Sequence, residues 1–288
     1  MSSRKSSPEP PAPAAADQAV PVAVQGAGLR RRRRHPALVP ALQIGFFLFV
    51  VGLWQLLVDS GAIDIFFFSR PSDIAVRLAE WLTSTRIYGH LAITLTEAML
   101  AFVIGTISGV IAGFALARFD LLAAVFDPYI RIFNALPRVI LAPIFILWFG
   151  LGIASKVALG VTLVFFIVFF NTFQGVREVD PVVLKNARML RASEAQLLRH
   201  VYIPSALAWI FSSLHTSIGF ALVGAVVGEY IGASRGIGYL VAQAQGTFDT
   251  TGVFAGLLLT SVVVLLIDMG INRLESHLLR WRPQKEQA

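Results

Sequence analysis

The chain has 288 residues, of which 56% are hydrophobic and only 14% are charged, with a formal net charge of +7 and no cysteine. The lack of cysteine excludes disulfides, thiolate metal sites and cysteine nucleophiles. The apolar residues fall in blocks of about 20 residues, the length that crosses about 30 Å of hydrocarbon as a helix, and this excludes a soluble domain with a single core.

The positive charge does not indicate nucleic-acid binding. The basic residues flank apolar blocks, which is the pattern of topology determinants, and they do not form a face with interleaved aromatic residues. We therefore expect membrane lipid, and no nucleic acid, among the partners.

Residues 1–36 are expected to form a disordered, basic cytoplasmic tail, because the segment through Gly28 is rich in Pro, Ala and Ser. The run Arg30–Arg34 precedes an apolar stretch, as it does in a signal peptide. That stretch, from Ala37 to Val58, is too long for a signal peptide and no A-x-A site follows it. We therefore expect an uncleaved first span, a membrane domain over residues 37–282 and a short tail at 283–288.

Hydropathy predicts an all-α polytopic membrane protein with about six transmembrane helices. The third apolar segment is long, about 45 Å as a helix, and contains Pro128, Pro137 and Pro143. We expect it to start at the cytoplasmic interface and to kink. The predicted spans are about 37–59, 90–117, 121–150, 155–174, 205–231 and 250–273.

The distribution of Lys and Arg predicts that both termini are cytoplasmic. With the N-terminus inside, 17 of these residues lie in cytoplasmic segments and 5, Lys156 among them, lie in outer segments. Arg131 and Arg138 are ambiguous. If the Lys and Arg residues of the N-terminal tail are left out of the count, the cytoplasmic segments still hold more of them than the outer segments, and the predicted orientation is unchanged.

Two predicted spans carry glycines at every fourth position, which lets helix backbones approach closely in lipid. Such ladders serve packing within one chain or, as the alternative, an interface between subunits. The glycines are Gly105, Gly109 and Gly113 in the second span, and Gly224, Gly228 and Gly232 in the fifth.

One long cytoplasmic loop, about 175–204, reads as two short helices. Asp180 is an N-cap before Pro181, and Val183, Ala187 and Leu190 recur on one side of the first helix. Ser193-Glu194-Ala195-Gln196 supplies a capping box for the second helix. Such a pair lies on lipid headgroups, packs under its own bundle or docks into a partner, and periodicity does not choose among these uses.

The order of residues here resembles the EAA loop of the binding-protein-dependent permeases, E-A-A-x-x-x-G followed by I-x-L-P. Val201-Tyr202-Ile203-Pro204 matches the second half and places Ala187 on the second alanine. The consensus glutamate falls on Lys185 and the consensus glycine on Arg191. The turn at Arg191 therefore keeps a negative φ, or else the loop is shifted.

Residues outside the loop resemble the nitrate, sulfonate and taurine branch of these permeases, and the resemblance covers roughly residues 65 to 282. The residues that carry it are Asp127-Pro128, Leu136-Pro137, Pro143, Leu147-Trp148-Phe149-Gly150, Ser155-Lys156, Glu229, Gly236-Ile237-Gly238 and Leu274-Glu275.

The resemblance implies the fold of a type I ABC importer permease in the bacterial inner membrane. It implies a dimer of permeases, most simply a homodimer, two cytoplasmic ABC ATPases that bind the ATP, and a periplasmic or lipid-anchored substrate-binding protein. Alternating access would move a small solute inward, and an organic or inorganic anion such as a sulfonate, nitrate or carboxylate is expected. The residues implied in ATPase coupling are Lys185, Ala187, Leu190, Arg191, Ala192, Ser193 and Glu194.

No catalytic, cofactor or metal site is expected in this chain. No G-x-x-x-x-G-K-[ST] occurs, and Ser155 stands where a phosphate loop needs glycine before Lys156. The main alternative function is a secondary transporter or channel without an ATPase, but we find no convincing internal repeat. A membrane-embedded enzyme lacks candidate residues.

Ionisable groups at membrane depth cost at least about 2.5–3.5 kcal/mol and so invite a functional interpretation. Arg138, His215 and Glu229 are the candidates for the translocation pathway. A hydrogen bond to a neighbouring helix is the alternative for His215, and a structural hydrogen bond at the interface is the alternative for Glu229. In the 232–249 loop, Arg235, Gly236 and Gly238 are the candidates for contact with the binding protein.

Overall fold

The computed structural model describes residues 38–278, apart from the side chains of residues 272 and 274–278. The predicted tails lie outside these residues, as do the side chains of Leu274 and Glu275. The described elements are all helical. They are α1 (Leu38–Asp59), α2 (Ile65–Phe68), α3 (Pro71–Thr83), α4 (Thr85–Arg118), α5 (Asp120–Ala135), η1 (Arg138–Leu141), α6 (Ala142–Phe149), α7 (Ile153–Arg177), α8 (Pro181–Met189), α9 (Glu194–Leu197), the π turn η2 (Leu198–Tyr202), α10 (Ile203–Gly232), α11 (Ile237–Gly246) and α12 (Thr250–Leu278).

Five helical stretches of the described chain are long and apolar enough to cross a membrane: α1, α4, α7, α12 and Glu194–Gly232, which ends with α10. The bent pair formed by α5 and η1–α6 brings the number to six if it counts as one span. These elements follow the predicted blocks in order. The predicted all-α polytopic architecture is therefore confirmed.

The third predicted span consists of two helices that meet at 87°. Ala135 ends α5, and Leu136 is extended with ψ of 134°, because the α conformation is disfavoured before a proline. Pro128 lies inside α5 without ending it, and Pro143 lies in the first turn of α6, where a missing N–H costs no helical bond. Of the three prolines, Pro137 alone marks the predicted kink.

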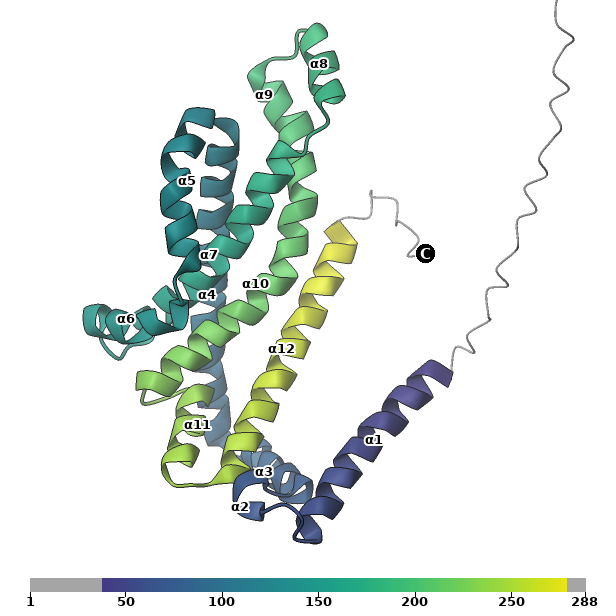
Figure 1. The fold of residues 1–288 in the computed structure, drawn as a ribbon, viewed down its shortest axis with the longest axis vertical. Coiled ribbons are helices and arrows are strands. Elements are labelled where there is room, and N and C mark those ends of the chain that lie inside the picture. Colours follow the sequence, from purple (N-terminus) through teal and green to yellow (C-terminus); the bar gives the residue numbers. More distant parts are fainter. Residues whose placement is uncertain (1–37, 279–288) are drawn as a thin grey trace, which may run out of the picture. The chain divides into compact units, whose positions relative to one another are not determined.

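Helix α7 packs along both α4 and α10, and these three helices are the centre of the unit that starts at Phe49 (Figure 1). The part of α1 that ends at Leu48 belongs to a separate unit. In the centre, Val164 of α7, Ala101 of α4 and Ala221 of α10 are completely buried. Small side chains thus hold three spans at close range.

Both glycine ladders pack within the chain, five of the six glycines against α7 and Gly232 against Ile146 and Leu151. A Cβ added at Gly109 would lie 2.8 Å from the carbonyl oxygen of Phe165, and one added at Gly228 would lie 2.9 Å from the side chain of Lys156. Such close approach leaves no room for a larger residue. The prediction of packing within the chain is confirmed, and the alternative of a subunit interface is wrong for these positions.

Helices α3 and α11 lie at the end of the unit away from α8 and α9 (Figure 1). Helix α3 begins at Pro71, and its Ile74 is 1% exposed. The 232–249 segment, predicted to be a loop, contains the helix α11. Ile237 at its start is buried against Ile87 and Leu259, and this tertiary contact stabilises a helix whose two glycines favoured a turn.

Candidate functional site

Helix α8 begins as the sequence predicts. The carboxylate of Asp180 accepts the N–H of Val182 at 2.7 Å, and Pro181 occupies the first turn. Both features satisfy or remove N–H groups that a helix N-terminus leaves without partners. The start of the 175–204 loop, called the coupling loop after the role that the resemblance implies for it, is therefore fixed by local sequence.

The turn at the C-terminus of α8 matches neither of the two expectations for Arg191, a negative φ or a shifted loop. Arg191 has φ of 57°, in the left-handed region where the family consensus has glycine. Its N–H donates to the carbonyl of Arg188 at 2.9 Å, and the N–H of Ala192 donates to that of Ala187 at 3.0 Å. This bond pair is the Schellman motif. The loop keeps the register of the consensus, and the arginine accepts a conformation that costs about 1–2 kcal/mol.

Helix α9 has the predicted capping box. The N–H of Ser193 donates to Oε1 of Gln196 at 2.8 Å, and the N–H of Gln196 donates to the Ser193 hydroxyl at 3.3 Å. The chain then passes through the π turn η2 into α10, whose first turn contains Pro204. Pro204 has no N–H to donate to the carbonyl four residues before it. The wider π turn can therefore precede Pro204 without the loss of a helical hydrogen bond at that position.

The predicted apolar stripe of α8 is divided between two environments. Ala187, together with Leu184, packs against a buried cluster that includes Val176 and Leu197 of this chain. On the other side Leu190 is 83% exposed and Met189 is 81% exposed, and Val182 and Val183 are exposed as well. Ala187 thus belongs to the inner face, which corrects the expectation that it shares a docking face with Val183 and Leu190.

An ion pair ties the loop to the end of α4. Arg118 donates to the carboxylate of Glu194, and its guanidinium lies 5.6 Å from the centre of the Tyr202 ring. A second pair, Arg177 with Asp120 at 2.8 Å, joins α7 to α5. Exposed pairs contribute little stability, and of the two only the Arg118–Glu194 pair restrains the loop, by holding α9 beside the end of α4. Sequence reasoning used Arg118 only as a topology charge.

Two of the predicted pathway residues have partners on this chain. Nδ1 of His215 on α10 lies 3.2 Å from Oδ1 of Asp268 on α12. Arg138, just after the break, donates to Oδ1 of Asn134 at 2.5 Å and lies 4.6 Å from the centre of the Phe166 ring. For His215 this arrangement matches the structural alternative, a polar contact between helices.

Glu229 is 1% exposed and accepts two hydrogen bonds, from the hydroxyl of Thr94 and from the N–H of Gly238, each at 2.7 Å. Gly236 has φ of 113°, and a Cβ there would overlap the Glu229 carboxylate. Gly236 and Gly238 are both buried. They pack against the Glu229 side chain inside the protein, which corrects their expected role as contacts for the binding protein.

Two further buried ionisable groups lie close enough to interact with Glu229. They are Glu97 on α4, 3% exposed, and Lys156 on α7, 1% exposed. Lys156 donates to the carbonyls of Leu151 at 2.5 Å and Gly232 at 2.6 Å. It is therefore a core residue and not the outer-segment charge that the topology count assumed. The sequence signal was its place in the first turn of a strongly apolar helix.

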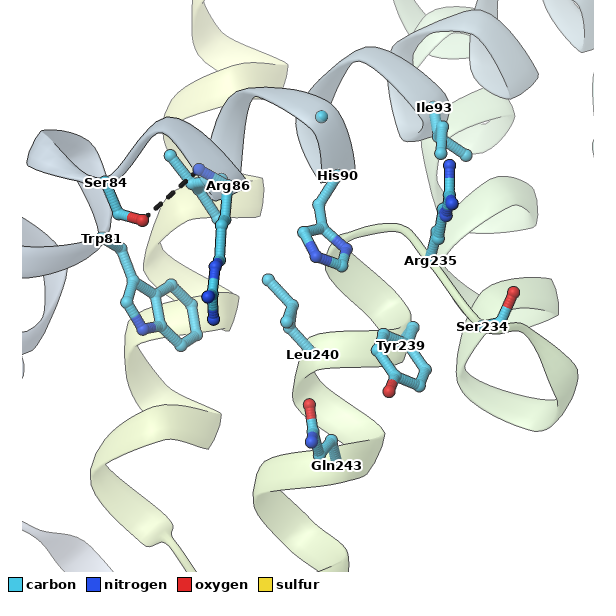
Figure 2. Close-up of a pocket in the computed structure, with 12 residues that line it drawn as sticks. Trp81, Ser84, Arg86, His90, Ile93, Ser234, Arg235, Tyr239, Leu240 and Gln243 are labelled. Carbon is cyan, nitrogen blue, oxygen red and sulfur yellow. Dashed lines mark hydrogen bonds between the residues drawn. The ribbon is translucent and has the colours of Figure 1, made fainter.

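A pocket of about 560 Å³ opens at the end of the bundle opposite α8, between the start of α4 and α11 (Figure 2). Arg86 and Arg235 line it on either side of His90, and Tyr239 and Gln243 of α11 lie below (Figure 2). Of the predicted binding-protein contacts, only Arg235 is exposed here.

These features belong to a known family. The family described as "Binding-protein-dependent transport system inner membrane component" matches residues 105–280, more than half of the chain and all of the coupling loop. The chain belongs to this family. The permease is the membrane-spanning, non-catalytic subunit of an ATP-driven ABC importer, and it works with an ATPase and a substrate-binding protein at the inner membrane. The predicted membership of the binding-protein-dependent permeases is confirmed.

Relatives extend along most of the permease. The aliphatic sulfonates transport permease protein SsuC of Bacillus subtilis is 34% identical over 241 residues, which cover 82% of the permease and 86% of SsuC. The taurine transport system permease protein TauC of Escherichia coli is 28% identical over 245 residues, covering 83% and 89%. In the structure of inward-facing MetNI methionine ABC transporter, one chain aligns with a TM-score of 0.54 at 19% identity, covering 68% of the permease and 95% of that chain. That similarity shows the predicted type I importer fold.

Proposed function

We propose that two copies of the permease form a pathway that imports a small anion, and that α8 and α9 are the surface that each ATPase contacts. Both termini and this surface face the cytoplasm, while the binding protein meets the end that carries α3 and α11. ATP-driven closure then moves the coupling loop and the spans together between two discrete arrangements.

The exposed pair Met189 and Leu190 carries the proposal for the coupling surface. Their neighbours Leu184 and Ala187 already pack under the bundle, so packing against the permease itself accounts for the inner face only. Apolar side chains that are 81% and 83% exposed at the tip of a braced loop fit an apolar groove on a partner. An ATPase is the partner that membership of this family supplies.

The proposal of an anion rests on the relatives and on charge. SsuC is named for aliphatic sulfonates and TauC for taurine, which is itself a sulfonate. The pocket opposite α8 has two arginines and no carboxylate among its lining residues. Arg138 and His215 remain candidates for the pathway itself, whereas we assign Glu229 a structural part at the outer end of α10.

Co-purification tests the coupling surface. The permease expressed with its ATPase should retain the ATPase, Leu190→Arg should lose it, and the matched Leu190→Met should keep it, because the groove accepts an apolar side chain. Ala187→Arg tests the inner face instead and should destabilise the loop. A permease that never retains the ATPase, yet takes up solute alone, would support the secondary-transporter alternative.

A further inference from the structure

The pocket between α4 and α11 has positive charge that nothing in the described chain neutralises. Arg86 and Arg235 are exposed, and neither guanidinium has an ion pair or hydrogen bond to another described residue. Arg70 and Arg131, by contrast, are paired with nearby aspartates. In this site two unpaired arginines line the same cavity.

Polar groups in the pocket beside the arginines can donate hydrogen bonds. Nδ1 of His90 accepts the N–H of Gly236 at 3.0 Å, so the ring hydrogen of the neutral imidazole is on Nε2. The His90 ring stacks on Tyr239, with ring centres 6.0 Å apart and planes 7° apart. The Ser84 hydroxyl accepts the N–H of Arg86 at 3.3 Å, which leaves its own hydrogen free to donate.

Apolar side chains line the cavity as well, namely Trp81, Ile87, Ile93 and Leu240, while Ser234 and Gln243 are polar members of the lining. Trp81 and Leu240 lie on the side of Arg86 (Figure 2). A site of about 560 Å³ is within the range of small-molecule pockets. Guanidinium groups bind the oxygens of sulfonates and carboxylates bidentately, and an apolar wall accommodates a short carbon chain.

We propose that this pocket binds a small aliphatic oxoanion, a sulfonate or carboxylate, with Arg86 and Arg235 on its charged group and Trp81 beside its carbon chain. This inference rests on the proposed function, because it makes the pocket the place where the permease receives the solute from the binding protein. The site is separate from the break at Pro137 and from the His215–Asp268 contact.

Quenching of Trp81 fluorescence tests the site directly. The probe is 2-bromoethanesulfonate, whose bromine quenches a tryptophan that it contacts, and the neutral control is 2-bromoethanol. With the permease in nanodiscs, the sulfonate should give saturable quenching that Trp81→Phe abolishes, while the alcohol should give only a linear, unsaturable loss. The natural lack of cysteine removes the most reactive target for alkylation by either probe.

Charge variants supply the second part of the test. Arg86→Gln and Arg235→Gln should each raise the apparent Kd for the sulfonate at least tenfold, and Arg86→Lys should raise it less. Arg131→Gln, which removes an exposed charge on α5, should leave it unchanged. Quenching that does not saturate, that is equal for the two probes, or that is unaffected by both pocket variants overturns the proposal.

Measurements with and without the ATPase separate this inference from the proposed function. If the permease retains the ATPase and supports solute-stimulated hydrolysis but shows no saturable quenching, the pocket proposal alone is overturned. If quenching saturates as expected but the ATPase never associates, the anion pocket stands and the coupling surface is wrong.

Discussion

The hydroxyl of Thr94 on α4 donates to Oε1 of Glu229 on α10 across 2.7 Å, although 135 residues separate the two in the chain. The hydroxyl oxygen of Thr94 in turn accepts the N–H of Ile237, the first residue of α11, at 2.9 Å. One buried hydroxyl therefore connects three helices. Thr94 and Glu229 are 0% and 1% exposed, so neither side chain can hydrogen-bond to water instead.

Removal of this hydroxyl should destabilise the fold. Thr94→Val keeps the shape but leaves the Ile237 N–H and one Glu229 oxygen without partners, and we expect a loss of about 1–3 kcal/mol in the free energy of unfolding. Thr94→Ser keeps the hydroxyl and should lose far less. Unfolding by SDS in mixed micelles measures the difference, and equal stabilities for the two variants would contradict the connection described here.

Gly236 should be intolerant of any side chain. Its φ of 113° is strained for L-residues, and a Cβ would overlap the Glu229 carboxylate, so Gly236→Ala should lower the melting temperature and the folded yield. Gly246→Ala is the matched control, because a Cβ at this end of α11 meets nothing within 4 Å. A melting temperature of Gly236→Ala equal to that of the control would show that Gly236 does not pack against the Glu229 carboxylate as described.

Replacing Arg191 by the consensus glycine should stabilise the coupling loop. Glycine adopts the left-handed conformation without strain, so Arg191→Gly should gain about 1 kcal/mol locally, whereas a β-branched valine should lose stability. Hydrogen exchange at the amide of Ala192, which donates to Ala187 at 3.0 Å, reports on this motif. Slower exchange in the glycine variant and faster exchange in Arg191→Val are expected. The reverse order would mean that the arginine side chain itself stabilises the turn.

The natural chain has no cysteine, so single cysteines report topology without a mutated background. Met189→Cys, at a position 81% exposed on α8, should react with a membrane-impermeant maleimide only in inside-out vesicles. Leu82→Cys, at a position 45% exposed near the end of α3, should react only in right-side-out vesicles. Labelling of both from one side would contradict the orientation derived from the Lys and Arg distribution.

Several features of the fold could be predicted because they depend on residues adjacent in the sequence. The apolar blocks predicted the spans, the prolines of the third block predicted its kink without choosing among Pro128, Pro137 and Pro143, and Asp180-Pro181 and Ser193–Gln196 placed the starts of α8 and α9. Caps and proline effects act over three or four residues, so local sequence contains all the information that they need.

The candidate site was less predictable where it depends on contacts between distant segments. The sequence by itself determined an α-helical membrane protein with two short helices in its 175–204 loop, because hydropathy and local capping require no partner, and the motif resemblance supplied the permease family. Only the tertiary structure decided that Ala187 turns toward its own bundle, and that Lys156 and Glu229 are buried while Arg86 and Arg235 share a pocket. The environment of a polar side chain is set by which helices pack together, and identical local patterns are compatible with a core, a surface or a cavity.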